Sequence, residues 1–414
     1  MQRIQPIGQF EKEILLPGDK SVTHRAVMLN SGADGEAVIT NALMGADCIS
    51  TCRCMRALGA KIESDGTSLR IRGTPNFQSG QALDCGNAGT TLRLLTGLLA
   101  GKGIEAKLYG DKSLSSRPMD RVAKPLALLG AEVRTTDGRA PVFVSPKKLY
   151  GADVELKIPS AQVKSAILLA GLSAEGETSV LEPLKSRDHT ERMLLAMGAK
   201  IYEEGNKVTV KKSDLKAADI DVPADISSAA YFMALGALKG RVLCKGVGIN
   251  RTRAGILTAF ERLGVTYSLV NRRVLSGEER ADILVEKSPL RGIEVTKKDI
   301  PAMIDELPLI ALLCAFADGE SRITGAEELR VKESDRIFAT AELIRNIGGE
   351  IEELEDGWII HGKRKLFGGN VDSHLDHRIA MTGAIGLLAS ENGGNLYRPE
   401  CCEISFPEFF KKLG

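Results

Sequence analysis

The sequence predicts an α/β protein of two similar domains, each built from three repeated α/β units with helices and mixed sheets. Three observations lead to this prediction. A segment in which a helix gives way, at a glycine, to a strand recurs along the chain. A second segment, an apolar helix followed by a small polar turn with glycine and then a strand, recurs as often. The length of 414 residues also exceeds that of most single domains.

The first repeated segment carries its glycine at the point where a helix should end. It reads RALGAKI at residues 56–62 and returns as ALLGAEV, LAMGAKI, ERLGVTY and RNIGGEI. Glycine is common after the last helical turn because it adopts the left-handed conformation at no steric cost. The glycines recur at intervals of about 70 residues, and they are Gly59, Gly130, Gly198, Gly264 and Gly348. The chain ends at Gly414 in FPEFFKKLG, which we interpret as a sixth copy.

The sixth copy lacks the strand that should follow its glycine. The N-terminal segment, which contains EKEILLPG, can supply that strand. We therefore predict one domain from residues 1–16 plus 225–414 and an inserted domain from residues 17–224, with three repeats in each. The chain would cross between them near Pro17–Lys20 and near Pro223–Asp225.

The composition excludes several classes of protein. Hydrophobic residues make up 43% and charged residues 26%, which is ordinary for a soluble globular protein. No apolar run is long enough to span a bilayer, and the start MQRIQPIGQFEKE has no secretory hydrophobic region. With 55 basic and 54 acidic side chains, the chain has no overall field that would attract nucleic acid. We expect a cytoplasmic monomer that binds neither membranes nor nucleic acid.

The eight cysteines form no recognisable framework. Their one cluster, in ADCISTCRCMRALG, places Cys48, Cys52, Met55 and Leu58 at helical spacing, which predicts the buried stripe of a helix. A metal site would need further ligands at defined spacing, and none lies near in sequence. We expect reduced cysteines, no metal site and no other cofactor.

The starts of the apolar helices carry residues that favour an anion. LPGDKSVTHRA places Lys20, Ser21 and Arg25 at a helix start, with Ser21 as the expected cap and Val22 on the buried face. Cations oppose the helix dipole at this end, so a bound anion would explain them. The other starts are also polar, small or charged, and they read GNAGTTLR, PSAQVK, ADISS, IDELP and DHR. Because helix N-termini present unpaired N–H groups, these segments predict a shared site for an anionic ligand.

The motifs together resemble those of a known family. LPGDKSVTHRA, GNAGTTLRLLTG, RPMDRV, SAQVKSAILLAGL, SRDHTE, LRVKESDRI and DHRIAM occur in this order along nearly the whole chain and resemble the 5-enolpyruvylshikimate-3-phosphate synthases. Three segments, SAQVK, RDHTE and NRTR, resemble the subgroup described as glyphosate-tolerant. The resemblance implies two domains of three repeats each, with the active site in the cleft between them.

The resemblance also implies an activity. A transferase of this family (3-phosphoshikimate 1-carboxyvinyltransferase) moves the enolpyruvyl group of phosphoenolpyruvate to the 5-hydroxyl of shikimate 3-phosphate. The addition forms a tetrahedral intermediate, and elimination then releases phosphate. The implied partners are these two small molecules, the implied context is the shikimate pathway of aromatic amino-acid biosynthesis, and glyphosate is the implied inhibitor. Both substrates are anions with a phosphate and a carboxylate, which arginine binds well.

By motif position, the resemblance assigns a role to individual residues. For shikimate 3-phosphate it implies Lys20, Ser21, Arg25, Ser160, Gln162, Arg187, Asp305 and Lys332. For phosphoenolpyruvate it implies Lys20, Gly89, Arg117, Gln162, Arg336 and Arg378. For proton transfer it implies Asp305, Glu333 and Lys20. Two positions depart from the pattern, because many members have Lys in place of Ile404 and Ser in place of Ala161.

Two alternatives remain open at this point. The related transferase that acts on UDP-N-acetylglucosamine typically has Asn after the first lysine and a reactive Cys in a mobile loop. Here Ser21 follows Lys20, and residues 110–119 contain no Cys. A non-catalytic binder of phosphorylated metabolites would use the same cations. Such a binder would gain nothing from carboxylates beside its ligand, so Asp305 and Glu333 favour an enzyme.

Overall fold

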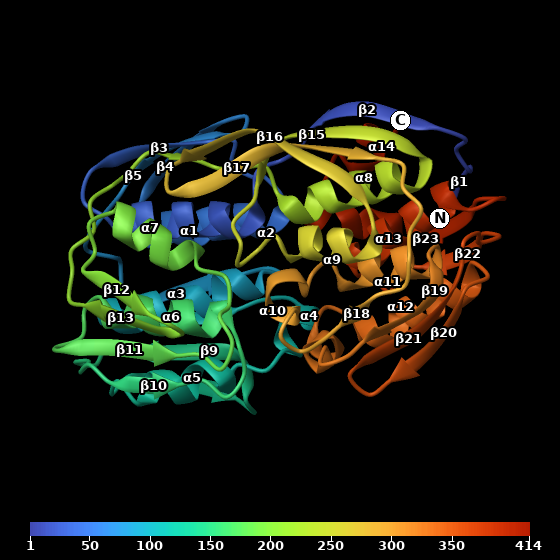
Figure 1. The fold of residues 1–414 in the computed structure, drawn as a ribbon. Coiled ribbons are helices and arrows are strands. Elements are labelled where there is room, and N and C mark those ends of the chain that lie inside the picture. Colours follow the sequence, from blue (N-terminus) through green and yellow to red (C-terminus); the bar gives the residue numbers. More distant parts are fainter. The chain divides into compact units, whose positions relative to one another are not determined.

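The structure, a computed structural model, describes residues 1–414. The chain forms two compact units, shown by their elements in Figure 1. Unit 1 comprises Met1–Pro17, Pro223–Arg273 and Glu279–Gly414, and unit 2 comprises Gly18–Val222 and Val274–Glu278. The short segment Val274–Glu278, the turn of a hairpin between β16 (Thr266–Leu275) and β17 (Glu278–Glu286), belongs to unit 2 although it lies far from the rest of that unit in the sequence. No helix is long and apolar enough to cross a membrane.

Unit 2 repeats one pattern of helix, strand, helix, strand and strand three times. The first copy consists of α1 (Lys20–Ser31), β3 (Glu36–Thr40), α2 (Ala46–Ala57), β4 (Lys61–Asp65) and β5 (Ser68–Arg72). The second consists of α3 (Gly89–Lys102), β7 (Ala106–Tyr109), α4 (Lys112–Ser115), α5 (Asp120–Ala127), β8 (Glu132–Thr136) and β9 (Arg139–Ser145). The third consists of α6 (Ala161–Gly171), β11 (Glu177–Leu181), α7 (His189–Ala196), β12 (Ile201–Glu204) and β13 (Lys207–Lys211).

Each repeat of unit 2 folds into a mixed sheet with the same strand order. The third strand of the repeat lies between the first and the second and is antiparallel to both. A further strand pairs in parallel with the first and completes the sheet. These further strands are β14 (Ile220–Asp221), β6 (Gln81–Asp84) and β10 (Asp153–Glu155).

Unit 1 contains three further copies of the pattern. The first consists of α8 (Ile226–Lys239), β15 (Gly240–Gly248), α9 (Gly255–Leu263), β16 (Thr266–Leu275) and β17 (Glu278–Glu286), with β2 (Phe10–Leu15) as the parallel strand. The second consists of α10 (Ile300–Met303), α11 (Leu307–Ala315), β19 (Asp318–Ile323), η1 (Glu327–Val331), α12 (Arg336–Asn346), β20 (Glu350–Leu354) and β21 (Gly357–Lys363), with β18 (Glu294–Val295). The third consists of α13 (His377–Ala389), β23 (Gly394–Tyr397), η2 (Pro399–Ile404) and α14 (Phe409–Leu413), with β22 (Gly369–Asp372). The predicted mixed α/β repeats are confirmed.

The sixth repeat is completed by the N-terminal segment, but the predicted strand was wrong. Strand β1 (Gln2–Ile4) pairs antiparallel with β23 and fills the place of the third strand. The segment EKEIL lies in β2 and pairs in parallel with β15 instead. The sheet of this repeat has three strands, in the order β1, β23 and β22, whereas the other sheets have four.

The glycines predicted to end helices do so. All five adopt the left-handed conformation, with φ between +82° and +104°. Any residue with a Cβ would be strained in this conformation, so the backbone of each of these repeats requires glycine at this position. The predicted buried stripe is also confirmed, because Cys48, Cys52 and Met55 lie buried on α2 and Leu58, directly after it, is buried as well.

In each repeat, the helix directly before the first strand lies in the core of its unit. In unit 2 these are α1, α3 and α6, and in unit 1 they are α8, α11 and α13. Their residues are buried on nearly all sides, since each packs against the other central helices and a sheet. A helix in this position must be apolar around its whole circumference, which is why the apolar segments were so regular in the sequence.

Helices α3 and α6 lie unusually close together because glycines face the contact. A Cβ built on Gly97 would lie 2.1 Å from the carbonyl oxygen of Ala166, and one on Gly101 would lie 2.9 Å from the Cα of Ala170. The backbone atoms that such a Cβ would meet cannot rotate away. The small residues therefore set the separation of the two helices, and with it the spacing of their N-terminal ends.

We expect Gly97→Ala to destabilise unit 2 by about 1–3 kcal/mol through overpacking. In a helix with room for the methyl group, a change from Gly to Ala raises the free energy of unfolding by roughly 0.5–1 kcal/mol. The close contact and the open helix therefore predict changes of opposite sign. Urea unfolding followed by circular dichroism measures the difference. An unchanged or higher midpoint in the variant would contradict the close approach of α3 and α6.

Candidate functional site

Helix α1 begins two residues earlier than expected, because Asp19 and not Ser21 caps it. The Asp19 carboxylate accepts a hydrogen bond from the backbone N–H of Val22 at 2.9 Å. Asp caps helices as well as Ser does, and the extended backbone at Asp19 moves the helix start forward. Lys20 and Ser21 are therefore the first two helical residues. The ammonium group of Lys20 forms an ion pair with Asp47 of α2.

Arg25 is almost completely buried at 3% exposure and is held by two neighbouring helices. Its Nε donates to the hydroxyl of Thr190 on α7 at 2.7 Å, and its Nη2 donates to the hydroxyl of Ser165 on α6 at 3.0 Å. Burial lowers the pKa of Arg25 to about 10, Glu191 opposes this effect, and the nearby cation Arg187 adds to it. Two cations this close in a buried setting favour an anion between or beside them.

A buried ion cluster fixes the elements that hold Arg25. Lys164 of α6, at 1% exposure, pairs with Glu182 at 2.7 Å and with Glu191 of α7 at 2.6 Å. The Glu182 carboxylate also accepts the backbone N–H of Ser186 at 3.2 Å, which is the residue before Arg187. The cluster therefore ties α6, α7 and the segment that carries Arg187 together.

The start of α3 brings two guanidinium groups against a glycine. A Cβ on Gly89 would lie 3.2 Å from Nη1 of Arg93 and 3.3 Å from Nη1 of Arg117. Arg117 is 7% exposed, and its Nη2 donates to the Asn87 side chain at 2.6 Å. The predicted residues Gly89 and Arg117 thus lie together, at a helix N-terminus that carries positive charge.

Gln162 links the starts of α3 and α6. Its Oε1 accepts a hydrogen bond from Arg93 at 2.5 Å, and its amide nitrogen donates to the hydroxyl of Thr90 at 3.0 Å. Ser160 caps α6 by accepting the N–H of Val163 at 3.4 Å. Arg93 belongs to GNAGTTLR, one of the helix starts predicted to share the anion site, but the resemblance assigned it to neither substrate.

The two histidines in the motifs of unit 2 make structural contacts. His24 is fully buried, and its Nδ1 lies 2.7 Å from the hydroxyl of Thr51. Burial, together with Lys20 and Arg25, keeps the pKa of His24 well below its usual range. His189 lies 2.7 Å from the carboxylate of Glu278. The structure brings together no group of three or more His, Cys, Asp or Glu that could hold a metal ion.

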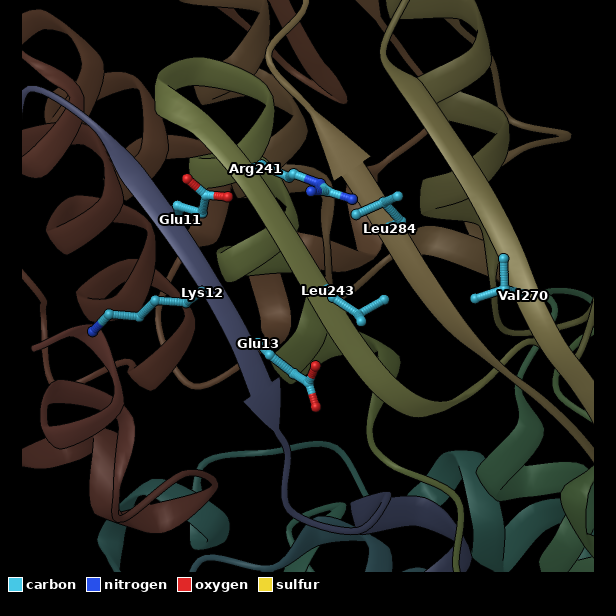
Figure 2. A pocket seen from close by; sticks show the side chains of 7 residues that line it. All are labelled: Glu11, Lys12, Glu13, Arg241, Leu243, Val270 and Leu284. Atoms are coloured by element: carbon cyan, nitrogen blue, oxygen red, sulfur yellow. The ribbon is translucent and has the colours of Figure 1, made fainter.

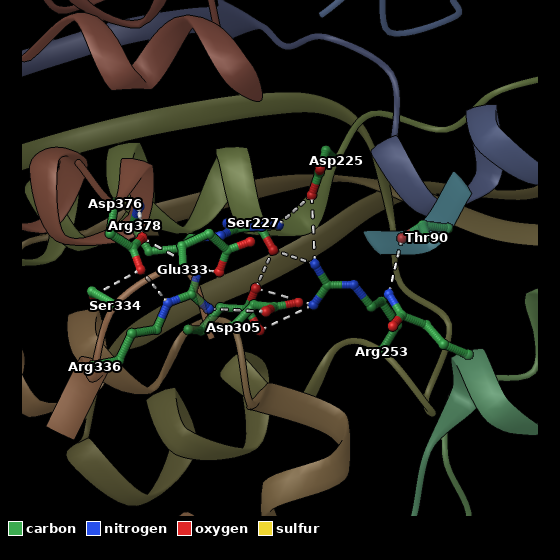
Figure 3. Close-up of polar contacts among 12 residues, drawn as sticks. Thr90, Asp225, Ser227, Arg253, Asp305, Glu333, Ser334, Arg336, Asp376 and Arg378 are labelled. Carbon is green, nitrogen blue, oxygen red and sulfur yellow. Dashed lines mark hydrogen bonds and ion pairs between the residues drawn. The ribbon is translucent and has the colours of Figure 1, made fainter. Parts of the chain in front are cut away.

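In unit 1, the start of α12 gathers carboxylates around one arginine, as Figure 3 shows. Arg336 is 1% exposed, and its Nε donates to Asp376 at 2.8 Å. Its Nη2 donates to Glu333 at 2.7 Å, and its Nη1 lies 3.5 Å from Asp305. Burial alone would lower the pKa of Arg336, but Asp376 and Glu333 outweigh it and raise the pKa. Three predicted residues, Asp305, Glu333 and Arg336, therefore lie together.

Asp376 connects this cluster to Arg378 at the start of α13. The carboxylate accepts the backbone N–H of Arg378 at 2.8 Å and the hydroxyl of Ser334 at 3.1 Å. Although burial opposes it, Arg336 keeps the pKa of Asp376 below its usual value. Burial would also lower the pKa of Arg378, but Tyr231 and the nearby carboxylates outweigh it and raise the pKa.

The remaining predicted residue of unit 1, Lys332, lies beside Asp305. Burial lowers the pKa of Lys332, Asp305 opposes this effect, and Arg336 adds to it. Ile404, where many members of the family that the sequence resembles have a lysine, packs against the apolar core of unit 1. That position offers no polar contact.

A second buried cluster in unit 1 holds the residue next to Asp305. Nη1 of Arg253 lies 3.0 Å from both carboxylate oxygens of Glu306. Arg253 and Glu306 also both bond the hydroxyl of Ser227 on α8 (Figure 3). Glu306, at 2% exposure, thus ties the start of α11 to that of α8 and limits where Asp305 can lie.

A hollow elsewhere on unit 1 contains none of the predicted residues. It measures about 420 Å³ and lies on the outer face of the sheet formed by β2, β15, β17 and β16, as Figure 2 shows. Its floor is apolar and its rim charged, and its lining residues are Glu11, Lys12, Glu13, Arg241, Leu243, Val270 and Leu284. The helix N-termini with their cations remain the candidate site.

Comparisons with known proteins agree on one family. The family model described as EPSP synthase (3-phosphoshikimate 1-carboxyvinyltransferase) matches residues 4–413. A 3-phosphoshikimate 1-carboxyvinyltransferase of Desulforudis audaxviator is 46% identical over 99% of this chain and 98% of its own length. One of Gloeobacter violaceus is 44% identical over 99% of this chain and 97% of its own length.

Solved structures agree with the sequence matches. The EPSP synthase from Acinetobacter baumannii superposes with a TM-score of 0.88 at 41% identity, covering 99% of this chain and 96% of that one. The enolpyruvyl transferase NikO from Streptomyces tendae superposes with a TM-score of 0.80 and the same coverage. At 19% identity, this second likeness concerns the fold alone.

Proposed function

The chain belongs to the EPSP synthase family, and from this premise we propose how its residues perform the family's reaction. The enzyme is a transferase that joins the enolpyruvyl group of phosphoenolpyruvate to the 5-hydroxyl of shikimate 3-phosphate. In the addition step the 5-oxygen bonds to C2 of phosphoenolpyruvate while C3 gains a proton. In the elimination step C3 loses a proton and the bond from C2 to the phosphate oxygen breaks, which releases phosphate.

Shikimate 3-phosphate binds mainly to unit 2 in this proposal. Arg25 and Arg187 supply adjacent positive charge for its phosphate, and the lowering of the pKa of Arg25 by Arg187, which adds to that by burial, supports this assignment. Hydrogen-bonding groups at the starts of α1 and α6 orient the rest of the molecule. The full set is Lys20, Ser21, Arg25, Ser160, Gln162 and Arg187 from unit 2, with Asp305 and Lys332 from unit 1.

Phosphoenolpyruvate binds where guanidinium groups gather. Because Gly89 has no side chain, the Nη1 atoms of Arg93 and Arg117 lie close to the start of α3, and this concentration of positive charge at a helix N-terminus supports an anion there. Bidentate contacts from arginine suit both a phosphate and a carboxylate. The proposed set is Lys20, Gly89, Arg117 and Gln162 from unit 2, with Arg336 and Arg378 from unit 1.

Two carboxylates move the protons in this proposal. Asp305 accepts the proton of the 5-hydroxyl as that oxygen attacks C2. Glu333 delivers a proton to C3 in the addition and removes one in the elimination. Lys20, whose ammonium pairs with Asp47, stabilises negative charge on the phosphate that leaves.

The transfer is tested by mixing the purified protein with both substrates and measuring phosphate release. The whole-length family match carries the proposal, so we expect phosphate and the enolpyruvyl ether to form in equal amounts. UDP-N-acetylglucosamine in place of shikimate 3-phosphate should release none, because Ser21 stands where that transferase has Asn. Phosphate release only with the nucleotide sugar would favour the alternative transferase. The expectations of a cytoplasmic location and a monomeric state stay predictions.

A further inference from the structure

The N–H groups of Arg336 are engaged by the protein's own carboxylates. Asp376 accepts from Nε at 2.8 Å, Glu333 accepts from Nη2 at 2.7 Å, and Asp305 lies 3.5 Å from Nη1. A guanidinium has five N–H donors in a fixed plane, and two that point the same way are needed to grip a phosphate or carboxylate. An anionic ligand that binds Arg336 must therefore replace one of these carboxylates.

The three carboxylates differ in how easily they can be replaced. The side chain of Asp376 is fully buried and also bonds the backbone of Arg378 and the hydroxyl of Ser334. The side chains of Glu333 and Asp305 are 18% and 19% exposed, so both can reach solvent. Asp376 is thus the fixed anchor of Arg336, and the other two carboxylates are the exchangeable ones.

We propose that Glu333 competes with phosphoenolpyruvate for Arg336, so that binding of this substrate displaces the Glu333 carboxylate from the guanidinium. The inference rests on the proposed function for the identity of the anion. Glu333 contacts Arg336 at a short distance through Nη2, whereas Asp305 lies at the limit of a hydrogen bond, so Glu333 is the stronger competitor.

The exchange gives Glu333 a second role that fits its proposed chemistry. A neighbouring cation favours the charged form of a carboxylate, so a Glu333 paired with Arg336 is a poor proton donor. Once the substrate takes its place, the displaced Glu333 carboxylate lies near the negative charge of the substrate and, being 18% exposed, takes up from solvent the proton that it delivers to C3. The step that fills the site therefore also prepares the group that protonates C3.

The test compares two variants that each remove one negative charge. Glu333→Gln keeps the shape of the side chain but replaces a charge-assisted hydrogen bond by a weaker neutral one. Glu327→Gln is the matched control, because Glu327 lies in the adjacent η1 and its partner is the exposed Lys297 at 3.4 Å. Calorimetric titration with phosphoenolpyruvate should give a dissociation constant about tenfold lower for Glu333→Gln than for the unmodified protein. The control should change it less than about twofold.

Several outcomes would overturn the inference. One is a Glu333→Gln protein that has a normal melting temperature but binds phosphoenolpyruvate no more tightly than the unmodified protein. Another is an equal decrease of the dissociation constant in Glu333→Gln and Glu327→Gln, since that decrease would reflect net charge alone. Absence of phosphoenolpyruvate binding in every protein would remove Arg336 from an anion site. A crystal structure of the complex provides the direct check, because a Glu333–Arg336 contact still at 2.7 Å would contradict displacement. Failure of phosphate release in the transfer assay, by contrast, would refute the proposed reaction without bearing on this competition.

Discussion

Asp305→Asn is expected to lower kcat by about 10²-fold or more, because it removes a general base while keeping the shape of the side chain. Asn cannot accept the proton of the 5-hydroxyl, yet it can still accept hydrogen bonds from Arg336 and other donors. The KM values of both substrates should therefore change much less than kcat. Steady-state kinetics with each substrate varied in turn separates the two effects.

The control for this experiment is Asp318→Asn. Asp318 lies at the start of β19, just beyond the far end of α11, and its exposed carboxylate pairs with Arg364. The change in net charge is the same, but turnover should stay close to that of the unmodified enzyme. Near-native turnover in Asp305→Asn would remove this residue from the proton-transfer steps.

Gly89→Ala is expected to raise the inhibition constant of glyphosate by at least about tenfold, and the KM of phosphoenolpyruvate far less. The new methyl carbon would lie 3.2 Å from Nη1 of Arg93 and 3.3 Å from Nη1 of Arg117. Both guanidinium groups end flexible side chains and can move by a few tenths of an ångström. The longer inhibitor loses room at this end of the site, whereas the shorter substrate still fits.

Competition experiments against phosphoenolpyruvate measure both constants for each protein. Since Gly89 is retained, we expect glyphosate to inhibit the unmodified enzyme at least in part. Gly8→Ala is a suitable control, because a Cβ there would have no atom within 4 Å. Parallel changes of the two constants in Gly89→Ala would show that the start of α3 does not discriminate between the ligands.

The repeats were predictable from sequence because each rests on a local requirement. A backbone position with positive φ requires glycine, and a helix that is buried on all sides requires apolar residues, so both can be recognised in the sequence. No such pattern indicates which strands the two N-terminal strands pair with. EKEIL lies in β2, which has six residues, while β1 has only three and is harder to recognise, so the sequence favoured the wrong partner for β23. Which strand neighbours which depends on contacts between distant segments.

The candidate site was predictable only in part, for the same reason. Residues at helix starts could be recognised from their motifs, but the contacts that join them run between helices. The bonds of Arg93 to Gln162 and of Asp376 to Arg336 each connect different repeats, and no spacing in the sequence reports them. The prediction of Ser21 as the cap of α1 was also wrong, since Asp19 caps this helix. Asp19 and Ser21 are both good caps, and the backbone angles decide between them.

The pairing of β1 with β23 has a consequence for the order in which the protein folds during its synthesis. Unit 2 is encoded almost entirely by Gly18–Val222, so most of it can fold while the rest of the chain is still being translated. Unit 1 begins with Met1–Pro17 but cannot complete its last sheet until residues 394–397 leave the ribosome. Strand β1 therefore leaves the ribosome long before its partner β23 and is among the last strands to pair. Until then it is an unpaired segment that chaperones can bind, and removing it should impair the final folding step of unit 1 while sparing unit 2.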